Sequence, residues 1–292
     1  MFNILLCAIM FAIEINAYFF ARINYGNIGG YVTMELFIKI IVCFFAGMGA
    51  GLGTGFAGLS AAAVVSPMLI TILHMNAFEA VGIALASDVL ASAVSAYTYG
   101  KNKNLDVKNG LTMMITVLVF TVVGSWVSSL VPSTTMGTFS VFMTLMLGIK
   151  FIVKPVMTTK ESMEAVSPKK RLIQSIICGM VIGFICGFIG AGGGMMMLLI
   201  LTSVMGYELK TAVGTSVFIM AFTAFTGAIS HFAMGDKPDV LILILCVLFT
   251  FVWAQIAAIF ANKAEPKVLN RVTGVVLAIL GVVMIIVQKV AV

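Results

Sequence analysis

Charged residues are scarce in this chain. They make up 10% of its 292 residues, whereas hydrophobic residues make up 61% and the mean hydropathy is +1.16. This composition excludes an ordinary soluble protein and leaves no stretch that could form a soluble catalytic domain. We therefore expect an all-α polytopic membrane protein whose function lies within its membrane segments, in contact with the lipid bilayer.

Residues that bind metals and cofactors are also few. The chain has two His residues, and its five Cys residues lie in apolar runs without a CxxC spacing. We therefore expect no disulfide, zinc site, haem or other cofactor. The net charge of +6 could indicate a nucleic acid partner, but Lys and Arg gather in short loops beside apolar segments. Such loops set membrane topology, so we expect no nucleic acid partner.

Glycine, in contrast, is abundant in two related places. The stretch 187–194 holds five glycines in eight residues, and the sequence GFAGLS at 55–60 begins 132 positions earlier. Ten residues of the first copy recur at this offset without a gap: Gly47, Met48, Gly51, Gly55, Phe56, Gly58, Leu69, Ala80, Val81 and Gly82. The sequence therefore indicates an internal duplication.

The glycine spacing has a structural meaning. Gly47, Gly51 and Gly55 recur every four residues, as do the glycines at 179, 183 and 187, and each set would line one face of a helix. Helix backbones can approach closely at such stripes, and tight packing is the favoured reading of the stripes alone. The consecutive glycines after 190 weaken a helix. Each copy thus predicts a helix, a break and a new helix, and for the duplicated break we favour a functional role.

The apolar segments divide the chain into repeats. Residues 1–35 form an extra N-terminal helix and loop, 36–153 the first repeat, 154–171 a basic linker and 172–292 the second repeat. The expected segments are 36–54, 59–73, 78–99, 110–131 and 135–153, then 172–190, 194–206, 210–234, 238–261 and 269–290. Segment 59–73 is shorter than the about 20 residues that cross a bilayer. A broken or re-entrant helix pair is expected there, and two full crossings remain open.

Five segments in each repeat imply that the two repeats have inverted topology. Their glycine breaks would then enter from opposite faces and could meet near the midplane, as in many secondary transporters. The loops 101–108, 154–171 and 263–271 are basic and should be cytoplasmic. We expect a multi-pass membrane protein, while the oligomeric state is open.

A helix that begins inside the membrane directs N–H groups and its positive dipole end at a cavity, and anions bind there. The expected ligands of a small anion are Gly58, Leu59, Ser60, Gly190, Ala191, Gly192, Gly193, Gly194, Thr215 and Ser216. For the last two, a bond to their own helix is the alternative. The first copy has Ile83 and Ala84 in their place, so we expect an asymmetric site.

Other polar residues in the apolar segments are candidates for coupling and cavity lining. Asp88 is the only acidic residue in the middle of either repeat, and Glu14 lies within the N-terminal segment. Either could carry a coupling proton, or Asp88 could join two helices. Ser92 and Ser95 share a helix face with Asp88. Candidates for lining a cavity are Ser92, Trp126, Trp253 and Gln255.

The motifs GFAGLS at 55–60, GFIGAGGG at 187–194 and AVGTS at 212–216 resemble the TauE/SafE family of sulfite-exporter-like transporters. The resemblance covers both repeats and implies a secondary carrier of small sulfur anions such as sulfite, sulfonates or sulfoacetate. It also implies a location in the plasma membrane of a bacterium or archaeon. Ser60-Ala61-Ala62 departs from the glycines of the second copy. An anion channel is the alternative function. An intramembrane enzyme is a weaker one, because no GxSxG or HExxH motif is present.

Overall fold

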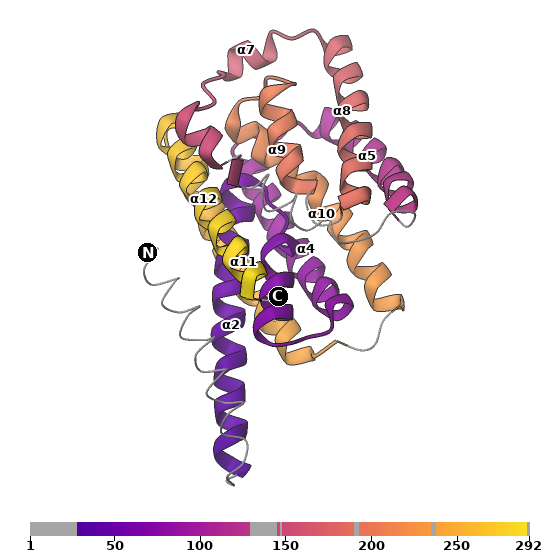
Figure 1. Ribbon diagram of the computed structural model, residues 1–292. Helices are drawn as coiled ribbons and strands as arrows, with labels where there is room; N and C mark the ends of the chain where they lie inside the picture. The colour runs from indigo at the N-terminus through magenta and orange to yellow at the C-terminus, as the bar shows by residue number, and fades with distance from the viewer. Residues whose placement is uncertain (1–27, 129–144, 147, 190–192, 235–237, 291–292) are drawn as a thin grey trace.

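The computed structural model describes residues 28–128, 145–146, 148–189, 193–234 and 238–290 (Figure 1). Every regular element in these ranges is a helix. The helices are α2 (Ile28–Ala57), α3 (Ala62–Ile72), α4 (Ala77–Lys101), α5 (Val107–Ser128), α7 (Lys160–Glu164), α8 (Pro168–Ile189), α9 (Gly193–Ser203), α10 (Leu209–Met234), α11 (Val240–Lys263) and α12 (Pro266–Val290). Five stretches are long and apolar enough to cross a membrane: Met34–Ala57, Phe78–Lys101, Leu209–Ala233, Val240–Lys263 and Pro266–Val283. The prediction of an all-α polytopic membrane protein is confirmed.

Most helices follow the expected segments closely, with two differences. Helix α2 begins at Ile28, whereas we expected a start at 36, and the linker contains the short helix α7. The side chain of Thr159 caps α7 by accepting a hydrogen bond from the backbone of Ser162. Glu14, the extra N-terminal helix and most of the expected segment 135–153 lie outside the described residues.

The first broken pair turns back on itself. Helix α2 ends at Ala57, and α3 ends at Ile72, beside the early part of α2. A cavity of about 510 Å³ at this end is lined by residues of α2, the end of α3, the connection to α4 and the starts of α4 and α11: Glu35, Ile38, Lys39, Ile72, Leu73, His74, Met75, Asn76, Glu79, Asp239 and Ile242. The end of α3 therefore lies close to residues 35–39 of α2.

The second broken pair turns back at the other end. Arg171, near the start of α8, lies with its guanidinium 4.6 Å from the ring centre of Tyr207, which follows α9. At this end the basic loops also meet: Asn104 donates to Asn262 at 2.7 Å, and Lys160 donates to the carbonyl of Lys103 at 2.6 Å. Helix α7 lies here too, far from the start of α2 (Figure 1).

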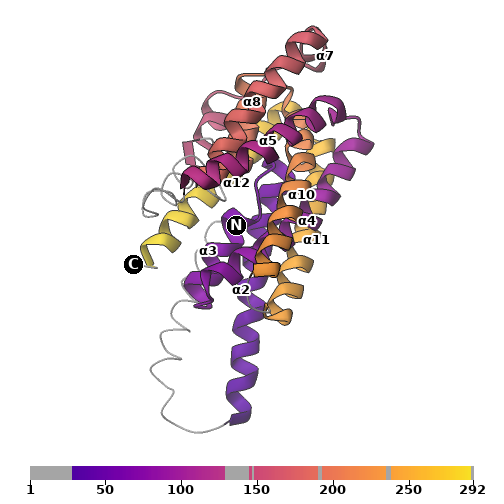
Figure 2. The same cartoon turned by 90° about the vertical axis from the view of Figure 1, so that its right-hand side faces the viewer.

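Two helix interfaces correspond in the duplication. Helix α2 packs along α11, α8 packs along α5, and α4 packs between α10 and α11 (Figure 2). A Cβ on Gly47 would lie 2.6 Å from the Cβ of Phe249 in α11, and one on Gly183 would lie 2.4 Å from the carbonyl of Val117 in α5. The predicted close approach of backbones at the stripes is confirmed for these described glycines.

One buried phenol connects α4 to the end of α2. Tyr99 is fully buried, and its hydroxyl donates to the carbonyl of Gly55 at 2.8 Å. Tyr99→Phe leaves this buried carbonyl without its donor, and we expect a loss of about 1–3 kcal/mol in the free energy of unfolding. Thermal unfolding in detergent measures it. Tyr97→Phe is the matched control, because Tyr97 lies on the same helix and is 71% exposed. Equal melting temperatures for the two variants would contradict the prediction.

Candidate functional site

The first glycine break is a hydrogen-bonded turn. Gly58 has φ +62°, a conformation that favours glycine, and its N–H donates to the carbonyl of Thr54 at 2.9 Å. The N–H of Leu59 donates to the carbonyl of Gly53 at 3.1 Å, and the Thr54 hydroxyl donates to the carbonyl of Leu59 at 2.8 Å. Two of the amides expected to bind an anion are thus engaged within the chain. Their role with substrate stays a prediction.

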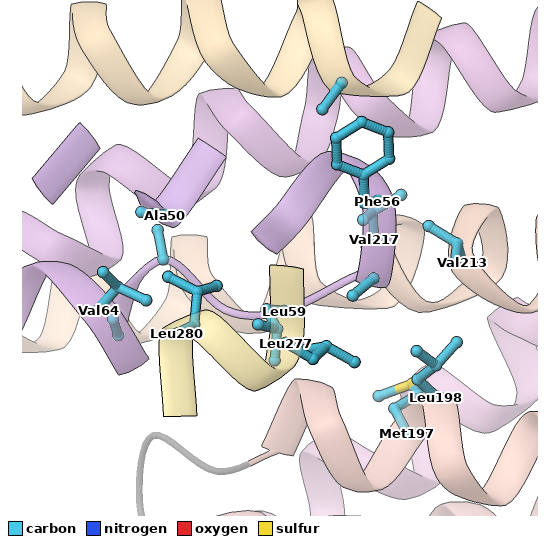
Figure 3. Close-up of a cluster of buried hydrophobic side chains, with 14 of the residues drawn as sticks. Ala50, Phe56, Leu59, Val64, Met197, Leu198, Val213, Val217, Leu277 and Leu280 are labelled. Atoms are coloured by element: carbon cyan, nitrogen blue, oxygen red, sulfur yellow. The ribbon is translucent and has the colours of Figure 1, made fainter. Parts of the chain in front are cut away.

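The side chain of Leu59 anchors this turn in the core. It is 2% exposed and points into the apolar cluster that includes Leu277 and Leu280 of α12 (Figure 3). The carbonyl of the neighbouring Phe56 accepts a hydrogen bond from Thr273 of α12 at 3.2 Å. The break is therefore fixed from the apolar side by the second half of the chain.

The side chain of Asp88, a residue of α4, lies beside the start of α3. The Ser60 hydroxyl donates to one carboxylate oxygen of Asp88 at 2.6 Å, and the Ser92 hydroxyl donates to the other at 2.7 Å. Asp88 is 1% exposed, whereas Ser60 is half-buried. The polar stripe of α4 therefore faces the first break. Ser95, on the same stripe, is buried with no hydrogen-bond partner for its hydroxyl among the described residues.

The start of α9 lies against the first break. Gly190, Ala191 and Gly192 lie outside the described residues, and α9 begins at Gly193. A Cβ on Gly194 would lie 2.8 Å from both the carbonyl oxygen of Gly58 and the amide nitrogen of Ser60. The start of α9 therefore contacts the first break, while a meeting of the two breaks near the midplane stays a prediction. Their binding role is not tested by this contact.

The hydroxyls of α10 make contacts across the two halves. Ser216 donates to the carbonyl of Gly58 at 3.0 Å, and Thr215 accepts a hydrogen bond from the amide of Asp106 at 3.2 Å. Neither bond is to a carbonyl of α10 itself. These contacts therefore differ from the alternative, in which the two hydroxyls bond to their own helix. Both residues are buried. The AVGTS motif therefore lies beside the first break, and substrate contact stays a prediction.

Sequence reasoning missed the residues that hold Asp106, the hydrogen-bond partner of Thr215. Tyr207 donates to a carboxylate oxygen of Asp106 at 2.8 Å, and the buried Arg171 lies over the Tyr207 ring. Burial raises the pKa of the Tyr207 phenol, so it remains a neutral donor. Arg171 also donates to the carbonyl of Met163. No motif or spacing signals these contacts, because the partners lie far apart in the chain.

The candidates for cavity lining lie at helix interfaces. Trp253 is half-buried, with its ring centre 6.2 Å from that of Phe44, and the amide oxygen of Gln255 accepts a hydrogen bond from Thr98 at 3.1 Å. The side chain of Trp126 is outside the described residues. A lining role for these residues stays a prediction.

The polar groups brought together here suit an oxyanion. They are hydroxyls and backbone amides at the starts of two helices, where the helix dipole favours negative charge. Within the described ranges there is no group of three His, Cys, Asp or Glu residues that could hold a metal ion. Among the hydrogen bonds described for Ser60, Asp88, Thr215 and Ser216, none involves a Lys or Arg side chain.

Comparison with known proteins finds related membrane transporters. The family model of the sulfite exporter TauE/SafE matches residues 43–284. The probable membrane transporter protein YunE of Bacillus subtilis is 26% identical over 264 residues, which cover 84% of this chain and 96% of that protein. A probable membrane transporter protein of Methanocaldococcus jannaschii is 26% identical over 266 residues, covering 85% and 94%. No solved structure matches. The names of its family and relatives indicate a multi-pass membrane transporter rather than an enzyme, and the chain belongs to the sulfite exporter TauE/SafE family.

Proposed function

We propose that this chain is a secondary active transporter that moves a small sulfur-containing anion, of the sulfite, sulfonate or sulfoacetate type, by alternating access. The observation that carries the proposal is the contact of Gly194 with Gly58 and Ser60, which brings the starts of α3 and α9 together. Two helix starts that face one position add their dipoles there. The family supports the choice of a sulfur anion.

The proposed architecture is a pair of inverted repeats, at 36–153 and 172–292, joined by the linker 154–171. It is supported by the two turns: α3 returns toward the start of α2, while α9 returns toward the start of α8 at the opposite end. In this proposal both pairs are re-entrant. The end that carries the basic loops is the cytoplasmic one, and the membrane is the plasma membrane of a bacterium or archaeon.

Hydroxyls and amides bind the anion in this proposal. Ser60 at the first break and Gly194 at the second provide the nearest donors, and Ser216 positions the Gly58 carbonyl. An anion that is bound without a Lys or Arg side chain dissociates readily, because no buried ion pair is broken when it leaves. That property suits a carrier, which must release its substrate after each change of access.

Counterflow in proteoliposomes tests the proposal. Vesicles preloaded with unlabelled sulfite or sulfoacetate should transiently accumulate the labelled anion above its equilibrium level, because a carrier exchanges one anion for another. An anion channel would let the label equilibrate without this overshoot. The absence of overshoot, together with flux that follows the membrane potential alone, would overturn the carrier in favour of the channel.

Asp88 is the proposed site of proton coupling. Asp88→Asn cannot release a proton, so the variant should lose accumulation driven by a pH gradient while keeping anion exchange. Uptake into vesicles with and without an imposed pH gradient measures both. The control is Asp239→Asn, which changes a half-buried acid at the start of α11, where Asn also caps a helix. Gradient-driven accumulation by Asp88→Asn equal to that of the control would contradict the coupling role.

A further inference from the structure

The donors at the start of α3 already hold an anionic group. The Ser60 hydroxyl, with its single proton, donates to a carboxylate oxygen of Asp88 at 2.6 Å. Ser92 holds the other carboxylate oxygen at 2.7 Å. An oxyanion at the start of α3 would need the same hydroxyl and the same helix start. The side chain of Asp88 therefore occupies the place that the proposed substrate requires.

The second half of the chain has a neutral residue in the equivalent place. The offset of 132 positions that relates the two halves pairs Asp88 with Met220. The Met220 sulfur would lie 2.8 Å from a Cβ on Gly194, the second residue of α9. Asp88 and Met220 thus cover the starts of equivalent helices. The two equivalent positions therefore hold an acidic residue in the first half and a neutral residue in the second.

We propose that Asp88 is a built-in competitor of the substrate: its carboxylate and the transported anion exclude each other at Ser60 and the start of α3. This inference rests on the proposed function. Two negative groups that share one donor repel each other strongly in a medium of low dielectric constant. The anion binds at this position only when the Asp88 carboxylate has left Ser60. The half-buried Ser60 is the part of the pair that an entering anion can reach.

The competition predicts that removing the carboxylate tightens anion binding. A ligand's apparent affinity falls by the fraction of protein that is competent to bind it, so a competitor that occupies nine-tenths of the molecules weakens binding about tenfold. Asp88→Asn removes the charge at nearly constant size, and Asp88→Ala also removes the competing group itself. Both variants should bind sulfite and sulfoacetate at least about tenfold more tightly than the unmodified protein, as measured by calorimetry at one fixed pH.

The matched control is Asp239→Asn, the same acid-to-amide change at the start of α11. Asp239 lies beside Glu79 in the first turn of α4, away from Ser60. The control variant should leave both dissociation constants unchanged. Ser60→Ala should weaken binding, and Ser60→Ala combined with Asp88→Asn should show less gain than Asp88→Asn alone, because the contested donor is gone. Folding of each variant is verified by its melting temperature.

Each result decides between the ideas. Tighter binding by Asp88→Asn and Asp88→Ala, but not by the control, supports competition. Unchanged or weaker binding by both folded variants overturns it, while anion binding by the unmodified protein would leave the proposed function standing. If neither the unmodified protein nor the Asp88 variants bind sulfite or sulfoacetate, the proposed function and the competition both fail.

Discussion

Gly194→Val should lower the rate of anion transport by about a hundredfold or more. A Cβ at this position would lie 2.8 Å from the Gly58 carbonyl, the Ser60 amide and the Met220 sulfur. Two of these atoms belong to the backbone of a fixed turn, so the starts of α3 and α9 must move apart. A displacement of about 1 Å at a site can cost on the order of a hundredfold in rate. Counterflow per folded molecule measures the change.

The control is Gly100→Val, near the end of α4. A Cβ there meets only a methyl group of Leu105, at 3.4 Å, which is ordinary contact. This variant should transport at close to the normal rate. Normal transport by Gly194→Val would remove the contact between the two breaks from the transport site. Loss of folded Gly194→Val protein would show instead that the contact is needed for stability.

The helices could be predicted from the sequence because their physical signals are local. Long apolar runs mark membrane segments, and α10, expected at 210–234, spans Leu209–Met234. The breaks were also predictable, because the consecutive glycines after 190 weaken a helix and the duplication predicts a break at the equivalent position of the first half. In that first break, Gly58 has a left-handed conformation that glycine takes without strain. These inferences need only neighbours along the chain.

The partners of the polar residues could not be predicted. Asp88 is conspicuous as an acid in an apolar segment, but its bond to Ser60 crosses 28 positions, and the bond between Asp106 and Thr215 crosses 109. Such pairs depend on how helices pack, and a single sequence does not record that packing. The turn at Gly58 shows the same limit. Its amide, a predicted ligand of the anion, donates to the carbonyl of Thr54, and the sequence does not reveal this bond.

Two glycines of the helix stripes should prove necessary for stability. A Cβ on Gly51 would lie 2.6 Å from the carbonyl of Thr250 and 2.7 Å from the Cβ of Trp253, and one on Gly183 would lie 2.4 Å from the carbonyl of Val117. Backbone atoms of a neighbouring helix cannot rotate away as side chains can. Gly51→Ala and Gly183→Ala should therefore each lower the free energy of unfolding by about 1–3 kcal/mol. Thermal unfolding in detergent measures both.

Gly49→Ala is the matched control for this prediction, because Gly49 lies on α2 between the stripe positions. Its Cβ would meet only methyl groups, of Leu280 and Val64, at 3.3 Å. Ala also favours a helix over Gly by about 1 kcal/mol, so this variant should be as stable as the unmodified protein or more stable. Because Gly51 and Gly183 lie at equivalent interfaces, they should show similar losses. A stable Gly51→Ala beside a destabilised Gly183→Ala would mean that the two halves pack by different rules.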